Sequence, residues 1–337
     1  MTKVLHRLSL LERAVLATTA YSDSFDTPLG FDEVCERCLF VPGSAHANAA
    51  RSQAQKRKDI QHALDELIKK NLLEKTSSPQ GSALYFLPGR KNTIAQRFTR
   101  HQHAQAKQSE IDQVVRFLRR VPWVTAVYLT GSMAMDAATD QSDIDFMIVT
   151  LPERLWLTRI VVSLYAQLQG KRRSWNHEES GSWCFNLWLD TNHLAVESSK
   201  QDVYRAYELL QAKLLLDKEN TDVCLAAENT WKASFFAVPK EIPATRCDVK
   251  QPFFIDQLPV LRQCFAFLDY LAWTVQHQYM KHHQTTERVG RGYAFFHPRD
   301  TKGGIFQNWH KSLERFLSKE EAIEILRPYV SAKDSSS

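Results

Sequence analysis

The spacing of hydrophobic residues predicts three helices followed by a β-hairpin within residues 1–90. Ser9 and Glu12 form a capping-box pattern that opens the first helix. The third helix is expected over residues 56–71, and residues 72–87 form two short apolar runs around a turn containing Pro and Gly. This region therefore predicts a small, mostly helical domain.

Three helices followed by a hairpin resemble a winged helix-turn-helix domain. In that arrangement the third helix is the recognition element, and here it begins with Lys56, Arg57 and Lys58. These three residues are the predicted DNA contacts. Many winged-helix domains contact only other proteins, so both roles stay open at this point.

The pattern changes after residue 120 to alternating strands and helices, which is typical of an α/β unit. A long basic helix over residues 91–120 is expected to connect this unit to the first domain. The α/β core is assigned to residues 121–200, a helical C-terminal region to 201–330 and a disordered tail to 331–337. The expected core elements are strands at 125–130, 143–149 and 184–189 and a helix at 154–169.

Composition fits a folded globular chain, since 44% of the 337 residues are hydrophobic and 24% are charged. The longest apolar run, 259–275, is interrupted by Arg262 and Asp269, so no membrane span is expected. The N-terminal residues lack the apolar segment of a secretory signal, and the six cysteines are scattered. We therefore expect reduced thiols and a cytoplasmic location.

The positive charge is concentrated in one stretch. Residues 51–120 contain fifteen Lys/Arg against six Asp/Glu, whereas the whole chain carries a formal charge of only +5. Such a stretch is typical of a surface that binds a polyanion, and it is equally typical of a solvent-exposed helix surface.

One segment of the α/β core carries recognisable chemistry. An apolar run ends at Gly131-Ser132, and ten residues later come Asp143 and Asp145 at the start of the next apolar run. Glycine permits close backbone approach, and free N–H groups at such a turn suit a phosphate. Two carboxylates two residues apart on a strand share one face, and their repulsion is relieved by a cation such as Mg²⁺.

This segment resembles the core motif of the polymerase-β-like nucleotidyltransferase superfamily, which has an apolar strand, Gly-Ser, a spacer and Asp-x-Asp. The resemblance covers roughly residues 120–200, and weaker similarity to an uncharacterised bacterial branch extends over most of the chain. It implies an α+β fold in which Asp143 and Asp145 bind Mg²⁺ or Mn²⁺ and act in catalysis. It also implies a nucleoside triphosphate substrate such as ATP, with Gly131 and Ser132 at the phosphates.

Two arginines after the metal strand, Arg154 and Arg159, are further candidates for binding the triphosphate. They equally suit a helix surface beside Glu153. The acceptor implied by the resemblance is a hydroxyl group on a small molecule, a protein or an RNA.

The sequence departs from the superfamily pattern at one position. Active members usually carry a third carboxylate on a later strand, where this chain has Asn186. An amide is a weak metal ligand and cannot act as a base. Four carboxylates are possible substitutes: Glu178, Glu179, Asp190 and Glu197.

Two functional hypotheses follow. The first is a metal-dependent nucleotidyltransferase, favoured by the intact Gly-Ser and Asp-x-Asp motifs. The second is a catalytically impaired nucleotide sensor that binds DNA, favoured by Asn186 and the basic stretch.

Overall fold

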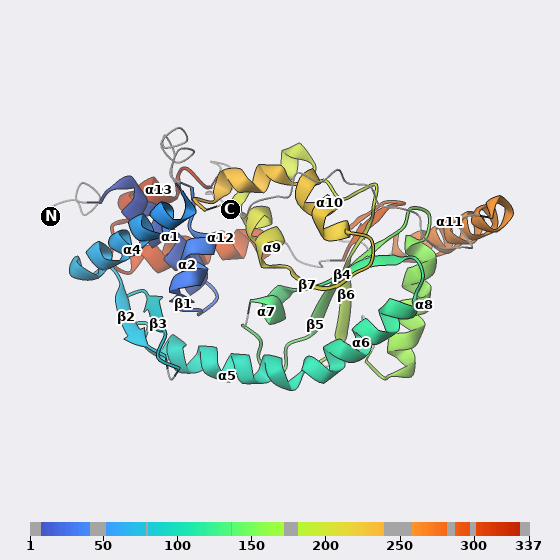
Figure 1. Ribbon diagram of the computed structural model, residues 1–337, viewed down its shortest axis with the longest axis horizontal. Coiled ribbons are helices and arrows are strands. Elements are labelled where there is room, and N and C mark those ends of the chain that lie inside the picture. The colour runs from blue at the N-terminus through green and yellow to red at the C-terminus, as the bar shows by residue number, and fades with distance from the viewer. Residues whose placement is uncertain are drawn as a thin grey trace.

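The computed structural model describes residues 8–40, 52–171 except 79 and 136, 181–238, 258–281, 287–296 and 301–330. An N-terminal unit lies at one end and a core built on a large sheet at the other (Figure 1). Two consecutive helices, α5 (Asn92–Ala106) and α6 (Gln108–Arg120), run along one side and connect them. The basic segment therefore forms two helices that meet at Lys107 and not one continuous helix.

The N-terminal unit contains the expected helices and hairpin. Its elements are α1 (Leu10–Asp23), β1 (Leu29–Gly30), α2 (Phe31–Arg37), α4 (Gln53–Lys69), β2 (Glu74–Ser77) and β3 (Ala83–Phe86). The strands form an antiparallel sheet in the order β1-β3-β2. The capping box at the start of α1 is confirmed, because Ser9 Oγ accepts from Glu12 N at 3.2 Å and Glu12 accepts from Ser9 N. The winged-helix interpretation of this unit stays a prediction.

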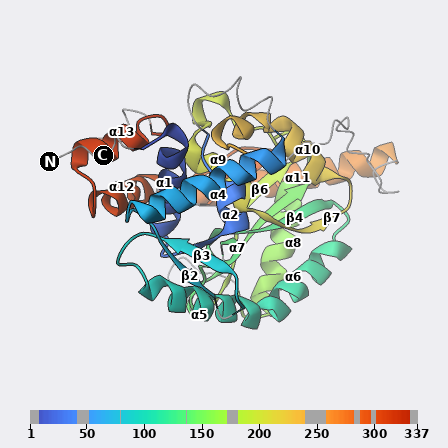
Figure 2. The same cartoon turned by 60° about the vertical axis from the view of Figure 1, so that its left-hand side comes forward.

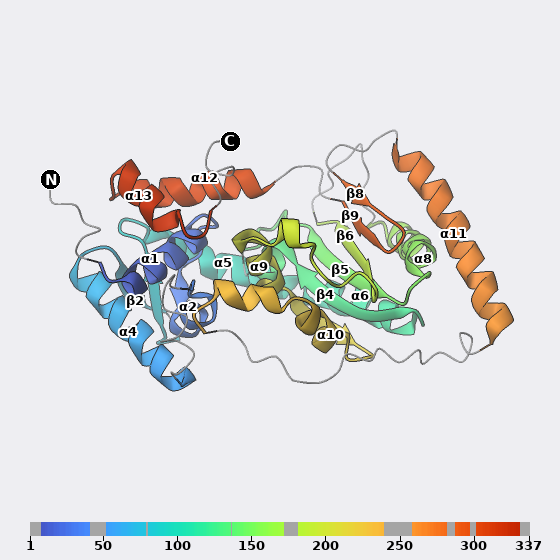
Figure 3. The same ribbon diagram turned by 90° about the horizontal axis from the view of Figure 1, so that it is seen from above.

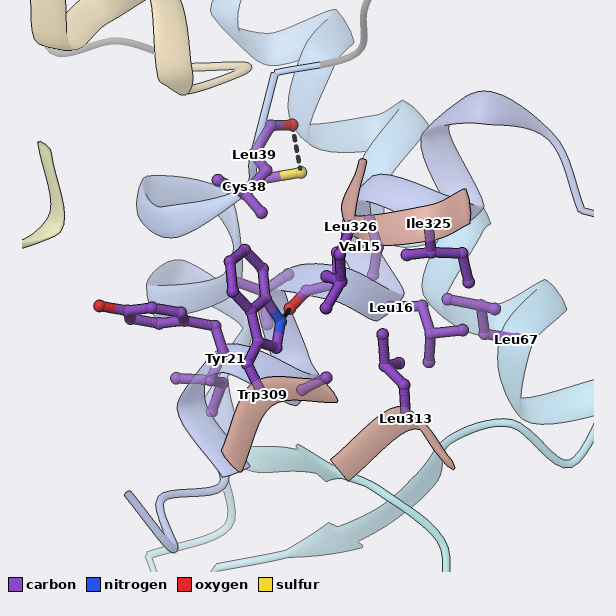
Figure 4. Close-up of a cluster of buried hydrophobic side chains, with 14 of the residues drawn as sticks. Val15, Leu16, Tyr21, Cys38, Leu39, Leu67, Trp309, Leu313, Ile325 and Leu326 are labelled. Carbon is purple, nitrogen blue, oxygen red and sulfur yellow. Dashed lines mark hydrogen bonds between the residues drawn. The ribbon is translucent and has the colours of Figure 1, made fainter. Parts of the chain in front are cut away.

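Two helices from the far end of the sequence complete the core of the N-terminal unit. They are α12 (Thr301–Glu314) and α13 (Lys319–Leu326), which pack against α1 in Figures 3 and 4. Trp309 is fully buried there and its Nε1 donates to Ala17 O at 2.8 Å. The hydrophobic pattern assigned these helices to a separate C-terminal region, because spacing along a helix does not reveal its distant partner.

The large sheet has six strands in the order β7-β4-β5-β6-β9-β8. At its centre β4 is antiparallel to β5, and β5 is parallel to β6. The strands are β4 (Val124–Thr130), β5 (Ile144–Thr150), β6 (Trp183–Asp190), β7 (Lys213–Asp217), β8 (Arg288–Val289) and β9 (Tyr293–Phe295). The three central strands are confirmed to within two residues of the sequence prediction.

Alternate residues of β4 and β5 enter two different hydrophobic clusters, which explains why these strands are apolar on both faces. Val127, Phe146 and Ile148 pack with α6 and α8 (Leu155–Leu168). The alternate residues, including Met147, pack on the opposite face with α10 (Thr221–Glu228). Figure 2 shows α6 and α8 together beside the sheet.

The C-terminal region contributes strands as well as helices. Residues 201–330 were expected to be helical, but α9 (Val203–Gln211) ends at residue 211 and the strand β7 follows it. The run Lys213–Asp217 is too short and apolar for its period to distinguish helix from strand. The segment forms a strand because β7 pairs with the edge of β4 in the large sheet.

The structure also bears on the expectations about membrane spans, cysteines and the C-terminal tail. No helix in the described residues is long and apolar enough to cross a membrane. The expectation that all cysteines are reduced is wrong for Cys224, which is disulfide-bonded, and spacing alone could not reveal that bond. The predicted disordered tail, residues 331–337, lies outside the described residues.

Candidate active site at the end of the central strands

The two aspartates lie at the beginning of β5. Asp145 is paired with Thr130 on β4 and with Cys184 on β6, so it is flanked by both neighbouring strands. Asp143 directly precedes the strand, and its Oδ1 accepts from the backbone N of Ser182 at 3.1 Å. Both aspartates are half-buried. The sheet therefore holds two carboxylates at one end, as the sequence predicts.

Gly131 lies against one of these carboxylates. Its φ of +63° lies in the left-handed region that favours glycine. A Cβ atom at this position would lie 2.3 Å from Asp145 Oδ2. Gly131 therefore allows both the turn and the close approach of the carboxylate.

Ser132 follows Gly131 in the short helix α7 (Gly131–Ala134) and is half-buried. In Figure 1, α7 lies on the side of the sheet nearest to the N-terminal unit. The turn predicted to bind phosphate and the aspartates predicted to bind the metal ion are thus adjacent.

Asn186 is the third polar side chain of this site. It lies on β6, and its Nδ2 donates to Asp145 Oδ1 at 3.0 Å. The side chain is buried, and no hydrogen-bond partner of its Oδ1 is found within the described part of the chain. The hydrogen bond to Asp145 therefore occupies the amide nitrogen and leaves the carbonyl oxygen of the side chain to another ligand.

An unsatisfied buried carbonyl oxygen costs free energy on the order of 1–3 kcal/mol unless a ligand or water meets it. A divalent cation beside Asp145 would satisfy this oxygen, since Mg²⁺ prefers hard oxygen ligands. The described residues contain no group of three His, Cys, Asp or Glu that could hold a metal. The set found here is instead two carboxylates and one amide, and its oxygen donors fit Mg²⁺ or Mn²⁺.

Two of the substitute carboxylates are placed elsewhere by the structure. Asp190 is at the other end of β6, where it pairs with Thr150 of β5. Its Oδ1 is hydrogen-bonded to His193 Nδ1 at 2.6 Å. Thr150 lies five positions after Asp145 along β5, which corresponds to about 17 Å. Glu197 is paired with Lys200 and with Arg288. Glu178 and Glu179 lie outside the described residues.

Lys107, which the sequence did not single out, lies near the aspartates. It is the residue between α5 and α6, and its Nζ donates to the backbone oxygen of Ser142. Burial lowers the pKa of Lys107, and the neighbouring carboxylates Glu110 and Asp143 oppose that shift. No periodic signal marks this lysine, because its role depends on where two helices meet.

The structure does not bring the two candidate arginines to the aspartates. Arg154 is buried beyond the far end of β5, where it donates to Glu153 O at 2.7 Å and to Arg262 O at 3.3 Å. Arg159 donates to Gln276, and its guanidinium lies 4.4 Å from the centre of the Phe296 ring. These partners favour a role in attaching α11 (Pro259–Lys281) to α8. A role at the phosphates stays an untested prediction.

In the described part of the chain, five of the fifteen basic residues in the stretch are paired with carboxylates of the N-terminal unit that precede the stretch. Such pairing attaches α5 to that unit and lowers the charge available to a polyanion. The exposed Lys58 on α4 remains a candidate DNA contact, whereas Arg57 also stacks on Phe31 with 4.9 Å to the ring centre. The pairs are Arg57–Asp32, Arg90–Asp23, Arg97–Glu33, Arg100–Asp26 and Lys70–Glu12.

Comparison with known proteins agrees with this geometry. Residues 110–207 match the family model of the nucleotidyltransferase domain, a span that contains β4, α7, β5 and β6. This part of the chain is therefore a nucleotidyltransferase domain, which is consistent with the resemblance to the polymerase-β-like superfamily and supports a transferase activity. No curated protein and no solved structure matches the chain.

Proposed function

We propose that the protein transfers a nucleoside monophosphate from a nucleoside triphosphate to a hydroxyl acceptor in a reaction that depends on a divalent cation. The observation that carries the proposal is the meeting of Gly131, Asp145 and Asn186 at one end of the central strands, with the Asn186 oxygen left for a ligand. Residues placed this way would hold Mg²⁺ or Mn²⁺ through Asp143, Asp145 and the Asn186 carbonyl oxygen.

A bound cation would lower the pKa of the attacking hydroxyl and stabilise the charge of the leaving pyrophosphate. Gly131 and Ser132 would bind phosphate oxygens beside the aspartates through backbone N–H groups and the serine hydroxyl. The acceptor oxygen bonds to the α-phosphorus while the bond to pyrophosphate breaks. An amide cannot take the acceptor proton, so that proton passes to an aspartate or to water and not to Asn186.

The test is metal-dependent binding of each nucleoside triphosphate by calorimetry, with pyrophosphate release measured in parallel. Wild type should bind and turn over at least one nucleotide in Mg²⁺ or Mn²⁺. Asp143→Asn with Asp145→Asn should abolish both, because the cation loses its charged ligands. The matched control is Asp140→Asn, an exposed aspartate on the same loop, which should behave as wild type. Unchanged turnover in the double variant would contradict the metal assignment.

A second function is favoured by one specific observation, the amide at the position where a third carboxylate is expected. With a weaker ligand and no base on β6, the domain would bind nucleotide without turning it over, and the N-terminal unit would contact DNA. Binding without pyrophosphate release for every acceptor offered would favour this alternative. Lys56→Ala with Lys58→Ala should then weaken DNA binding and reduce its salt dependence.

A further inference from the structure

Helix α11 carries an apolar stripe that no other described element covers. Figure 3 shows α11 at the end of the molecule opposite the N-terminal unit, lying across α8. The inner face of α11 packs against the domain, and its residues Asp269, Ala272 and Met280 are buried. The stripe on its outer face consists of Val260, Cys264, Phe267, Leu268, Leu271, Val275 and Tyr279.

The exposure of this stripe is large for a folded monomer. Val260 is 72% exposed, Val275 is 68% exposed, and Phe267 and Tyr279 are each 61% exposed. A whole aromatic side chain presents about 150–250 Å², so Phe267 and Tyr279 together expose roughly 200–300 Å², and the five smaller side chains of the stripe add to this. The largest apolar patch on a typical monomer is about 300–600 Å², and a standard interface buries about 800 Å² per partner. The stripe is therefore in the size range of a functional apolar patch.

Six of the seven stripe residues, all except Phe267, have the same spacing in both directions along the helix. Positions 260, 264, 268, 271, 275 and 279 are separated by four, four, three, four and four residues. Two antiparallel copies related by a two-fold axis would pair Leu268 with Leu271, Cys264 with Val275 and Val260 with Tyr279. Each of these pairs places small or apolar side chains together. The stripe is thus complementary to itself.

Charge also favours a second copy over other occupants. No charged residue falls on the stripe, because Arg262 and Lys281 lie on other faces of α11 and Asp269 is buried. A neutral stripe offers no complementary charge for a charged partner. Helices that lie on membranes usually carry many Lys and Arg on the polar face, and α11 has only two basic residues.

We propose that α11 is the interface of a symmetric homodimer, formed by antiparallel packing of the α11 stripe on the same stripe of a second copy. The two nucleotidyltransferase domains would then lie on either side of the α11 pair, since α11 is attached to each domain through α8. Asp269 contributes to that attachment by accepting from Leu157 N at 2.8 Å at the start of α8.

The first test is the mass in solution, measured by light scattering and sedimentation at micromolar concentrations. Wild type should be a dimer, and Leu271→Glu with Val275→Glu should be a monomer with an unchanged circular dichroism spectrum. The matched control is Gln263→Glu, an exposed position off the stripe, which should remain dimeric. A monomeric wild type, or a dimer that survives the double substitution, would overturn the proposal. A monomer that binds phosphatidylserine vesicles through the stripe would also overturn it, in favour of a membrane surface.

A second test examines the antiparallel register and does not depend on weakening the fold. With Val275→Cys, mild oxidation should link the new cysteine to the native Cys264 of the other copy and give a covalent dimer. Val275→Cys with Cys264→Ser should not form the link, because the two copies of position 275 would be about 16 Å apart along the helices. That separation is beyond the reach of a disulfide. Equal linking with and without Cys264 would contradict the register.

Discussion

Replacement of Gly131 by alanine tests how closely the turn and the carboxylate depend on each other. The substitution adds a Cβ at a backbone φ of +63°, and that atom would lie 2.3 Å from Asp145 Oδ2. The left-handed conformation alone costs about 1–2 kcal/mol for a residue with a Cβ. In addition, the carboxylate of Asp145 must move away from the new Cβ by roughly 1 Å, because ordinary carbon–oxygen contacts are longer than about 3 Å. A displacement of that size reduces turnover by about 100-fold.

Gly170→Ala separates the two effects. Gly170 has a similar φ of +65°, but a Cβ there would have no atom within 4 Å. Both variants should lose about 1–2 kcal/mol of unfolding free energy in a denaturant titration. Metal-dependent pyrophosphate release should fall by about 100-fold in Gly131→Ala only. If Gly131→Ala retains the turnover of Gly170→Ala, the carboxylate at Asp145 is not part of the reacting site.

Three further predictions concern the amide, the N-terminal unit and α11. Asn186→Leu should weaken metal binding by about 10-fold or more in a Mn²⁺ titration, because it removes the oxygen that faces the proposed ion; unchanged affinity would remove Asn186 from the ligand set. Burial opposes the charge on Glu33, but Arg97 and Arg37 outweigh it and hold the pKa of Glu33 below its ordinary 4.5. Its stabilisation is therefore present above pH 4.5 and lost as the pH falls through the lowered pKa, so Glu33→Gln should cost about 1.5–3 kcal/mol at pH 7 and flatten the acid dependence of unfolding. Asp269→Leu should destabilise the domain by about 1–3 kcal/mol in denaturant, because the half-buried backbone N–H of Leu157 loses its acceptor.

The sequence was a good guide to the central strands for a physical reason. β4 and β5 are buried on both faces, so each is a continuous apolar run with a polar boundary at the site. The Asp-x-Asp spacing then placed two carboxylates at one end of β5. Local patterns were sufficient here because strand burial and strand ends are encoded in adjacent residues.

Other parts of the site depend on contacts between distant residues. The hydrogen bond from Asn186 to Asp145 spans 41 positions, and it follows from the parallel pairing of β5 and β6. Arg154 reaches the backbone of Arg262, 108 positions away, and therefore lies with α11 and not beside the aspartates. The charge count of residues 51–120 likewise gave no sign that Arg97 pairs with Glu33. Such outcomes are set by tertiary packing and not by local spacing.

The measurement that tests the central proposal most directly uses a nucleoside triphosphate labelled on the α-phosphate and, separately, on the γ-phosphate. Polyol, protein and RNA acceptors are offered in turn with Mg²⁺ or Mn²⁺. Transfer of a nucleoside monophosphate predicts that the α label joins the acceptor and that the γ label leaves as pyrophosphate. Asp143→Asn with Asp145→Asn should show neither event. Release of the γ label as orthophosphate, or turnover that persists in the double variant, would contradict the proposed function.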